Sequence, residues 1–402
     1  MRVVVWGINY APEVTGIGPC NTALCEHLRD AGHEVEMVTT FQYYPAWKKN
    51  AEDRGRIWRT DRINGIPVHR CWHYVPETVT KLKRIIHEAT FVATSFARLA
   101  TCPRADVIVA VSPPLLLGAA AWLASKITGS RYVFHVQDLQ PDAAIGLGML
   151  KPSAFTRLLY ALESFAYRHA CRVSGISRGM LAAFYGKGVP GSKCLLFPNG
   201  IALDSLPSVK GEFRKLHGLA ADDFLAVYSG NIGVKQGLEG LVDGARRVTN
   251  PRVRIFICGD GAQRREIERR AEGLTTVKIL PLLPQAKYRA MLADADLAVI
   301  TQTAGSGRSF FPSKLLPAFG AALPVLSVAD EESELARALQ ESGGGLNVLP
   351  NQPHELARAL DRLADAPSVR EAYAKAGRAW VEQFEVSRLH AAFIEELETA
   401  IR

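Results

Sequence analysis

Long apolar runs are absent from this 402-residue sequence. The opening MRVVVWGINYAPE becomes polar too early for the core of a secretory signal peptide, and no stretch of about 20 apolar residues suggests a membrane-spanning helix. Tandem repeats of about 20–50 residues are also missing. The hydrophobic fraction of 48% nevertheless suffices for packed cores, which excludes a disordered chain. At roughly 100–200 residues per domain, we expect two domains.

The cysteines lack the spacing of a zinc site. Their number is odd, and they are scattered along the chain as Cys20, Cys25, Cys71, Cys102, Cys171, Cys194 and Cys258. We therefore expect reduced thiols, a cytoplasmic protein and no metal site.

Tracts of lysine and arginine with interleaved aromatic residues are also lacking, so nucleic acid is not an expected partner. The formal net charge is nonetheless +8. A basic balance of this size favours an anionic membrane surface or a phosphorylated substrate.

Apolar strand-like runs alternate with helical patterns along the chain. The runs are RVVVWGI, HEVEMVTT, ADVIVAVSP, SRYVFHVQDL, CRVSGIS and KCLLFPNG, then DFLAVYSG, VRIFICGDG, TVKILPLLP, ADLAVITQ and ALPVLSVA. This alternation predicts an α/β protein with two Rossmann-like, doubly wound domains that face a central cleft. We expect an N-terminal domain at residues 1–200, a C-terminal nucleotide-binding domain at 201–380, and a terminal amphipathic helix at 381–402 that packs on the N-terminal domain.

The stretch YSGNIGVKQG, residues 228–237, has the composition of a phosphate-binding turn between a strand and a helix. Gly230 and Gly233, on either side of Asn231, would let the backbone approach a diphosphate. Lys235 would supply a cation. An ordinary strand–helix turn with a surface lysine is the alternative.

Dinucleotide and triphosphate sites fit the chain poorly. A dinucleotide fingerprint needs glycines directly after the first strand and an acidic residue about 20 residues further on. Here the glycines are Gly16 and Gly18, and the second strand ends in MVTTFQYYP. A Walker A loop needs a hydroxyl residue beside its lysine, which is missing beside Lys235. A sugar nucleotide remains.

Two further glycine-bearing strand tips follow. Gly259 and Gly261 in CGDGAQRREIE would leave bare backbone for a base or ribose. In FPSKLLPAFG, Ser313 is expected to cap a helix with Pro312 in its first turn, and Lys314 to lie at the positive end of the helix dipole. A cation there opposes the dipole by about 0.3–1 kcal/mol, which favours an anion between them. A solvated lysine is the alternative.

Six segments together resemble glycosyltransferase family 4 of the GT-B fold, over nearly the whole length. They are PEVTGIGPCNTALCEHLRDAGHEVEMVTT, HVQDLQPD, FPNGIAL, YSGNIGVKQGLEGL, CGDGAQRREIE and FPSKLLPAFGAALPVL. The variants QDLQPD and FPSKLL are most similar to the bacterial exopolysaccharide branch, which includes colanic-acid-type transferases. The resemblance implies transfer of a sugar, with retention, from a UDP- or GDP-linked donor to a lipid-linked saccharide. It implies no cofactor or metal, and an enzyme held peripherally on the inner face of the cell membrane.

The resemblance also implies site residues. It places Gly16 and Gly18 beneath the diphosphate and the acceptor. Two glutamates of many family members match Ser309 and Pro317, so both carboxylates are missing here. The ribose and sugar contacts must then come from elsewhere, such as Glu239, Ser313 or the backbone of the glycine loops.

The segment VFHVQDLQPD is the candidate for the reacting centre. His135 and Gln137 are expected on one side of a strand and Asp138 on the other. The family's His-Asp pair matches Gln137 and Asp138, so a neutral amide replaces the histidine. We expect Asp138 to orient the acceptor hydroxyl and His135 to bond the donor. A buried core histidine and a turn-capping aspartate are the alternative.

Two other segments have patterns that suggest chemistry or binding. KLKRIIHEATFVATSFARLA, residues 81–100, alternates basic residues with Ile85, Phe91, Val92, Phe96 and Leu99. It fits a helix on an anionic membrane, although an ordinary domain helix has the same pattern. Asp294 and Asp296 in DADL mimic a metal-binding motif, but their place between a helix and a strand predicts a solvated turn.

Two other functions stay open on the sequence. The first is a GT-B-fold sugar-nucleotide epimerase, which needs acidic or histidine groups around the sugar, whereas this site is poor in carboxylates. The second is a non-catalytic homologue that binds a sugar nucleotide, and the two missing glutamates favour it.

Overall fold

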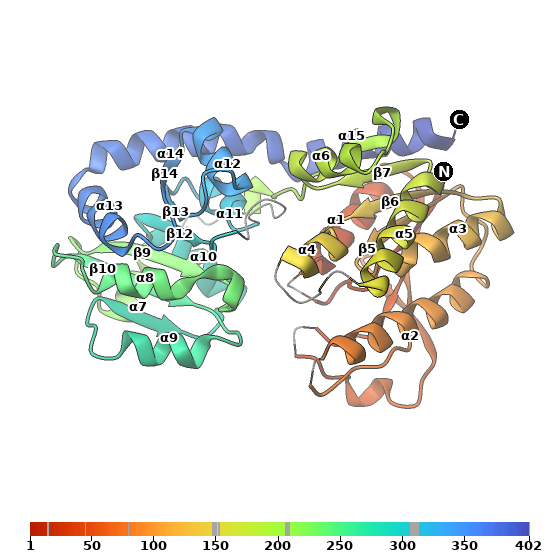
Figure 1. The fold of residues 1–402 in the computed structure, drawn as a ribbon, viewed down its shortest axis with the longest axis horizontal. Helices are drawn as coiled ribbons and strands as arrows, with labels where there is room; N and C mark the ends of the chain where they lie inside the picture. The colour runs from red at the N-terminus through yellow and green to blue at the C-terminus, as the bar shows by residue number, and fades with distance from the viewer. Residues whose placement is uncertain are drawn as a thin grey trace. The chain divides into compact units, whose positions relative to one another are not determined.

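The computed structural model describes residues 1–13, 16–44, 46–78, 80–146, 151, 153–205, 210–305 and 313–401. The chain divides into two compact units (Figure 1). Unit 1 is Met1–Asn199 together with Ser387–Arg402, and unit 2 is Gly200–Val386.

Unit 1 contains a sheet with the strand order β3-β4-β2-β1-β5-β6-β7-β8. Every neighbouring pair is parallel except β3 and β4. The strands are β1 (Arg2–Trp6), β2 (Glu34–Thr40), β3 (Trp58–Ile63), β4 (Ile66–Cys71), β5 (Val107–Ser112), β6 (Arg131–Val136), β7 (Arg172–Gly175) and β8 (Cys194–Leu196). The helices are α1 (Gly18–Asp30), α2 (Lys81–Leu99), α3 (Leu116–Thr128), α4 (Gln140–Gly146), α5 (Ala154–His169), α6 (Arg178–Gly186) and α15 (Val386–Ile401).

Both faces of this sheet are buried, because successive residues of a strand point to opposite sides. In β1, Val4 and Trp6 join one hydrophobic cluster, while Val3 and Val5 join another. The second cluster also contains α15 residues such as Phe393, whose ring stacks on that of Phe197 with centroids 4.0 Å apart. The terminal helix therefore covers one face of the unit 1 sheet.

Unit 2 contains a fully parallel sheet with the strand order β11-β10-β9-β12-β13-β14. The strands are β9 (Phe224–Ser229), β10 (Val253–Cys258), β11 (Val277–Leu280), β12 (Leu297–Thr301), β13 (Val325–Val328) and β14 (Gly345–Val348). The helices are α7 (Glu212–His217), α8 (Leu238–Ala245), α9 (Arg264–Ala271), α10 (Gln285–Asp294), α11 (Leu315–Gly320), α12 (Glu334–Ser342), α13 (Pro353–Asp365) and α14 (Pro367–Val381).

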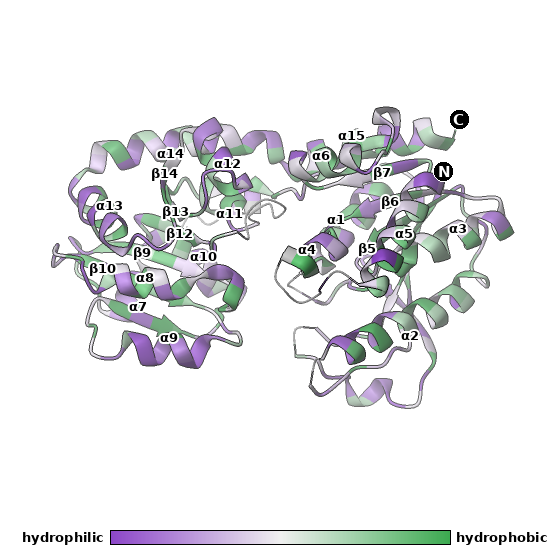
Figure 2. Ribbon diagram, in the orientation of Figure 1, coloured by the Kyte–Doolittle hydropathy of each residue, from purple (hydrophilic) through white to green (hydrophobic). Residues whose placement is uncertain are grey.

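The helices of unit 2 differ in hydropathy (Figure 2). Helix α9 is strongly hydrophilic, and Ile267 is its only buried side chain. The strands of unit 2 instead bury both faces: Ala226 and Tyr228 of β9 lie in one cluster and Val227 in the other. This arrangement is typical of a doubly wound parallel sheet with helices on both faces.

These two parallel-sheet units confirm the predicted α/β fold class, and each predicted strand-like run contains a strand. The antiparallel hairpin of β3 and β4, and the strand β14, were not predicted. The terminal helix begins at Val386 rather than at residue 381, since Val381 ends α14 and a 3₁₀ turn, Glu382–Phe384, separates the two helices. Among the described residues, no helix combines the length and apolar character needed to cross a bilayer.

Candidate functional site

The order of strands in unit 2 identifies one edge of its sheet as a candidate binding site. The chain builds outward from β9 through β10 to β11, then returns to the other side of β9 and continues through β12 to β14. Ligands of doubly wound sheets bind outside the carboxyl ends of the strands at such a reversal. The glycine loop that follows β9 and the residues that precede α11 both belong to this edge.

The first two glycine loops of unit 2 are joined through their backbones. The N–H of Gly230 donates to the carbonyl of Cys258 over 2.9 Å, and that of Ile232 donates to the carbonyl of Asp260 over 2.8 Å. A Cβ on Gly259 would lie 1.9 Å from the carbonyl oxygen of Gly230. A Cβ on Gly261 would lie 2.4 Å from the carbonyl oxygen of Ile232. The positions that side chains would take on these glycines are therefore filled by the neighbouring loop, which explains why both residues are glycine. Their predicted contact with a base or ribose stays a prediction.

Lys314, which precedes α11 on the other side of the sheet reversal, contacts this pair of loops. Its ammonium donates to the hydroxyl of Tyr228 and lies 3.9 Å from the centroid of that ring. The tyrosine hydroxyl in turn donates to the carbonyl of Asn231 over 2.6 Å. A Cβ on Gly230, whose φ is +137°, would lie 2.5 Å from Cε of Lys314. Gly230 therefore provides the space through which the lysine reaches the tyrosine.

Burial lowers the pKa of Lys314 from 10.5 to about 7. An anion placed beside the ammonium would favour its charged form and raise that pKa again. Lys314 is the N-cap residue of α11, as its predicted place at the helix dipole requires. Ser313 is exposed and precedes the cap, so it does not cap the helix as predicted, and no described side chain does.

The other donor-binding predictions lie on the same glycine loop. Lys235 is half-buried in a 3₁₀ turn, Val234–Gln236, and its carbonyl accepts the N–H of Thr303 over 2.9 Å. The N–H of Gly233 donates to Oε1 of Gln236 over 3.2 Å, so this backbone N–H stabilises the turn and does not point to a phosphate. Asn231 is exposed at the tip of the loop.

Four positions bear on the missing glutamates and on the start of α11, and two of them lie among the described residues. Glu239 lies in the first turn of α8 and is half-buried, and Pro317 lies inside α11. Ser309 and Pro312 lie outside the described residues.

His135 lies in the core of unit 1, where its side chain is 2% exposed. Its Nε2 accepts a hydrogen bond from Nε2 of Gln137 over 2.8 Å, which leaves Nδ1 to donate to Oγ of Ser174 over 2.9 Å. Burial lowers the pKa of His135 to about 3, so the ring is neutral. Both nitrogens are occupied inside the fold, and the predicted bond from His135 to the donor is therefore wrong.

Gln137 is also fixed from its other side. Its amide nitrogen donates to Oδ1 of Asn199 over 2.9 Å, and Nδ2 of Asn199 donates back to Oε1 of Gln137 over 2.9 Å. This reciprocal pair joins the segments QDLQPD and FPNG at one end of the sheet. Asp138 follows β6 and is half-buried next to the start of α4, so its predicted role with the acceptor stays a prediction.

The loop after β1 surrounds a carboxylate that was missed in the sequence. Glu13 is 4% exposed and accepts hydrogen bonds from Nδ2 of Asn9 over 2.7 Å and from the N–H groups of Tyr43 and Tyr44 over 3.2 and 3.1 Å. Burial raises the pKa of Glu13 despite these bonds. The strand order of unit 1 reverses between β1 and β5, so this loop lies at the reversal of its own sheet.

Gly16 and Gly18 shape this loop. Gly16 has a φ of +68°, and a Cβ on Gly18 would lie 3.1 Å from the carbonyl oxygen of Glu13. No sequence signal identifies Glu13, because its backbone partners Tyr43 and Tyr44 come from the loop after β2. The predicted place of both glycines under the diphosphate and acceptor stays a prediction.

The DADL segment is structural rather than a solvated turn. Asp294 is 5% exposed and accepts the N–H groups of Phe213 and Arg214 over 2.7 and 3.0 Å, which caps α7 from a distant part of the sequence. Asp296 pairs with the guanidinium of Arg214 at 2.6 Å.

Helix α2 forms where the basic amphipathic pattern predicts it. Its side chains Phe91, Val92 and Leu99 are buried in a hydrophobic cluster of unit 1. Contrary to the prediction, these three side chains are not available to a membrane. The first turns differ, because Leu82 and Ile85 are 67% and 46% exposed.

The comparisons with known proteins agree with this architecture. Residues 15–200 match the family model of the glycosyl transferase 4-like domain, and residues 209–380 match that of the glycosyl transferases group 1. The chain is 32% identical over 356 residues to WcaI of Escherichia coli (strain K12), which is named as a colanic acid biosynthesis glycosyl transferase. That match covers 86% of this chain and 87% of WcaI. A glycosyltransferase by name, WbjE of Pseudomonas aeruginosa, is 29% identical over 65% of this chain and 67% of its own length.

Solved structures show the same fold. Sucrose-phosphate synthase from Thermosynechococcus elongatus has a TM-score of 0.78 at 18% identity and covers 99% of this chain and 98% of its own. Anabaena HepE, solved in complex with UDP-glucose, has a TM-score of 0.71 at 18% identity and covers 99% of this chain and 100% of its own. WaaG, a glycosyltransferase involved in lipopolysaccharide biosynthesis, has a TM-score of 0.69 at 16% identity over 98% and 99% of the two chains. The chain thus belongs to glycosyltransferase family 4 of the GT-B fold, in its bacterial exopolysaccharide branch.

Proposed function

We propose that this glycosyltransferase takes its sugar from a UDP- or GDP-linked donor and transfers it, with retention of configuration, to a lipid-linked saccharide. The observation that carries the donor assignment is the position of Lys314 at the sheet reversal of unit 2, beside the glycine loop after β9. HepE, which has the same fold, binds UDP and UDP-glucose. Both observations support a nucleoside diphosphate at this edge of unit 2.

The chemistry expected there needs charge stabilisation more than a protein nucleophile. As the bond to the diphosphate breaks, negative charge grows on the leaving oxygen, which can itself take the proton of the acceptor hydroxyl. Lys314 and Lys235 lie on the loops that would face this charge, and a cation fixed beforehand stabilises the transition state more than the ground state. No cofactor or metal has a step in this proposal.

A thermal-shift panel with UDP, GDP, NAD and ATP tests the nucleotide assignment. We expect UDP or GDP to raise the melting temperature of the wild-type protein, because a ligand that binds only the folded state stabilises it. The Lys314→Met variant should lose most of this shift. Stabilisation by NAD or ATP but by neither diphosphate would overturn the donor class. A transfer assay with a polyprenyl-linked saccharide, with product anomers resolved by NMR, then tests the acceptor and the retention.

We further propose that the protein acts in the cytoplasm, held peripherally on the inner face of the cell membrane by the first turns of α2. Leu82, Ile85 and Ile86 are 67%, 46% and 40% exposed there, beside the exposed basic residues Lys81 and Arg84. Apolar side chains next to basic ones suit the boundary of an anionic bilayer.

Flotation with liposomes tests this contact. The wild-type protein should float with phosphatidylglycerol liposomes at low salt, be released at high salt because charge attraction is screened, and bind phosphatidylcholine poorly. Replacing Leu82, Ile85 and Ile86 by serine should abolish flotation. Leu158→Ser is the matched control, since Leu158 is 63% exposed but lies on α5. Equal flotation of the triple variant would exclude α2 as the contact.

A further inference from the structure

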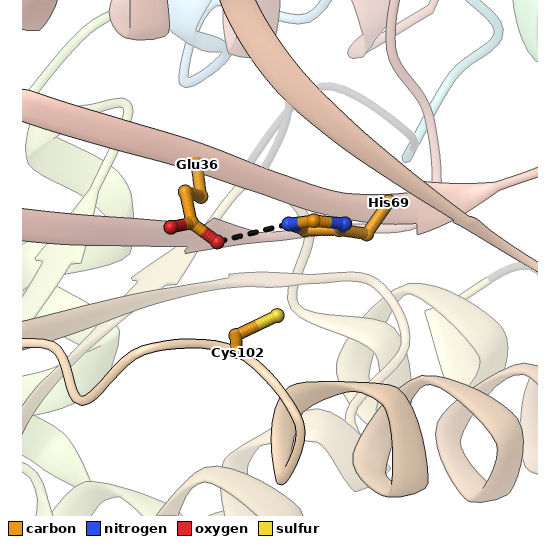
Figure 3. Close-up of side chains that lie close together, drawn as sticks. All are labelled: Glu36, His69 and Cys102. Carbon is orange, nitrogen blue, oxygen red and sulfur yellow. Dashed lines mark hydrogen bonds and ion pairs between the residues drawn. The ribbon is translucent and has the colours of Figure 1, made fainter. Parts of the chain in front are cut away.

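Three metal-ligand side chains meet on one face of the unit 1 sheet, although they are far apart in the sequence. Glu36 belongs to β2, His69 to β4, and Cys102 to the loop after α2. One ligand atom from each lies within 4.8 Å of the others. Figure 3 shows the three side chains together, with Glu36 and His69 on neighbouring strands. We propose that Glu36, His69 and Cys102 bind one Zn²⁺ ion.

The register of the sheet creates this group. His69 of β4 pairs with Val38 of β2, and Glu36 lies two residues before Val38, so Glu36 and His69 point to the same face as diagonal neighbours. On its other side, His69 pairs directly with Thr60 of β3. Cys102 reaches this face from the loop that returns after α2, and its side chain is half-buried.

Both ring nitrogens of His69 have polar partners, which fix the orientation of the ring. Its Nε2 lies 2.9 Å from Oε2 of Glu36, and its Nδ1 lies 3.1 Å from Oγ1 of Thr60. When Nε2 binds a metal, its proton is lost and Nδ1 carries the proton instead, which it can donate to Thr60. Metal-binding histidines commonly have such a fixed partner on the second nitrogen. A guanidinium can only donate, and Nη2 of Arg98 lies 3.0 Å from Nδ1 and 3.0 Å from Oγ1 of Thr60, so metal binding requires Arg98 to leave the histidine while it keeps its bonds to Thr60 and Thr101.

The charges and ligand types point to zinc among divalent ions. A carboxylate and a thiolate together neutralise a doubly charged ion, and the imidazole completes a set of oxygen, nitrogen and sulfur ligands. Zn²⁺ takes all three types, with a fourth position for water, whereas Mg²⁺ prefers oxygen ligands only. Zinc binding displaces the proton of the Cys102 thiol, because only the thiolate is a metal ligand.

The site is separate from the proposed donor site. Glu36 lies near the amino end of β2, whereas the loops at the sheet reversals follow the carboxyl ends of the strands. An ion there would join two strands to the end of α2, so we expect it to stabilise unit 1 rather than take part in sugar transfer.

Metal binding by the purified full-length protein tests the proposal directly. After chelator treatment and equilibrium dialysis against Zn²⁺, the wild-type protein should hold about one equivalent more than the Cys102→Ser and Glu36→Gln variants. Titration with Co²⁺ as a spectroscopic probe should give the near-ultraviolet absorption of a thiolate–cobalt bond. This band should disappear in Cys102→Ser and persist in Cys194→Ser, the matched control, because Cys194 is a half-buried free thiol outside the cluster.

Two further measurements separate a ligand effect from a folding effect. Thr60→Val should weaken Zn²⁺ binding by about 10–100-fold, as expected for loss of a bond to a ligand histidine, and loss of the thiolate should weaken it more. The metal-free melting temperatures of all variants show whether each still folds. The proposal is overturned if Cys102→Ser binds as much Zn²⁺ as the wild type or gives the same cobalt band. It is also overturned if the wild type neither binds Zn²⁺ nor gives that band.

Discussion

The ammonium of Lys314 and the phenol ring of Tyr228 form a hydrogen bond and a cation–π contact at once, with Nζ 3.9 Å from the ring centroid. The tyrosine lies near the end of β9 and the lysine at the start of α11, on the two sides of the sheet reversal. A cation is thus fixed where unit 2 is expected to receive a diphosphate.

We expect kcat/KM for the donor to fall as the pH rises through about 7. Burial lowers the pKa of Lys314 to about 7, so the free enzyme loses this cation above that pH. The profile of kcat/KM reports groups of the free enzyme. Lys314→Arg should remove this alkaline limb, because an arginine stays charged. Tyr228→Phe is the control that keeps the amine. Identical profiles for the wild type and Lys314→Arg would show that Lys314 is not the titrating group.

Lys235→Ala should reduce donor use strongly. A charged hydrogen bond to phosphate contributes about 1.5–3 kcal/mol, which corresponds to a loss of roughly tenfold to over a hundredfold. Because charge grows on the leaving group, kcat should fall as well as donor affinity. Lys215→Ala, on the exposed surface of α7, is the control. Steady-state constants of Lys235→Ala within about twofold of the wild type, small against that expected loss, would remove Lys235 from the site.

Gly259→Ala should destabilise unit 2 and weaken nucleotide binding together. The new Cβ would lie 1.9 Å from the carbonyl oxygen of Gly230, so one loop must move away from the other. Gly240→Ala is the control, because a Cβ there meets nothing within 4 Å. In a helix this replacement should be neutral or stabilise the protein by up to about 1 kcal/mol. Melting temperatures with and without UDP measure both effects, and an unchanged Gly259→Ala protein would contradict the loop contact.

Asp138→Asn should lower sugar transfer while leaving nucleotide affinity nearly intact. The reason is its proposed place beside the acceptor hydroxyl at the carboxyl end of β6, rather than beside the diphosphate. Isothermal titration with the nucleotide and a transfer assay give the two readouts. A normally folded variant that transfers at the wild-type rate would make this segment structural.

His135→Leu should lower stability rather than catalysis. The change leaves Ser174 and Gln137 without their buried partner, which typically costs about 1–3 kcal/mol. Denaturant unfolding measures the loss, and kcat per folded molecule should stay near that of the wild type. A large fall in kcat with unchanged stability would restore His135 to the reaction.

Much of the fold could be predicted because most parallel strands are apolar runs that end in a glycine or polar turn. The hairpin of β3 and β4 carried its own signal: Asn64 and Gly65 both have positive φ, 49° and 81°, and an Asn-Gly pair between two strand-like segments is typical of a two-residue turn. The signal was missed because both strands contain charged residues, and β3 lies at the edge of the sheet.

Contacts between distant segments could not be predicted from the sequence. His135 and Gln137 share a face by simple alternation, but only the positions of Ser174 and Asn199 show that both side chains are held by hydrogen bonds within the fold. The group of Glu36, His69 and Cys102 has no recognisable spacing, because it depends on the order and register of β2, β3 and β4. Sequence patterns describe neighbours along one element, whereas these sites join several.

The place of α15 has a consequence for biosynthesis. Its residues Phe393 and Leu397 cover the same face of the sheet as Val3 and Val5, so one core is made from the first and last parts of this chain. During translation β1 emerges from the ribosome long before α15, so this apolar face lacks α15 while all of unit 2 is synthesised. An N-terminal fragment that ends at Asn199 should therefore aggregate when expressed alone, and a separately supplied peptide of Val386–Ile401 should rescue it.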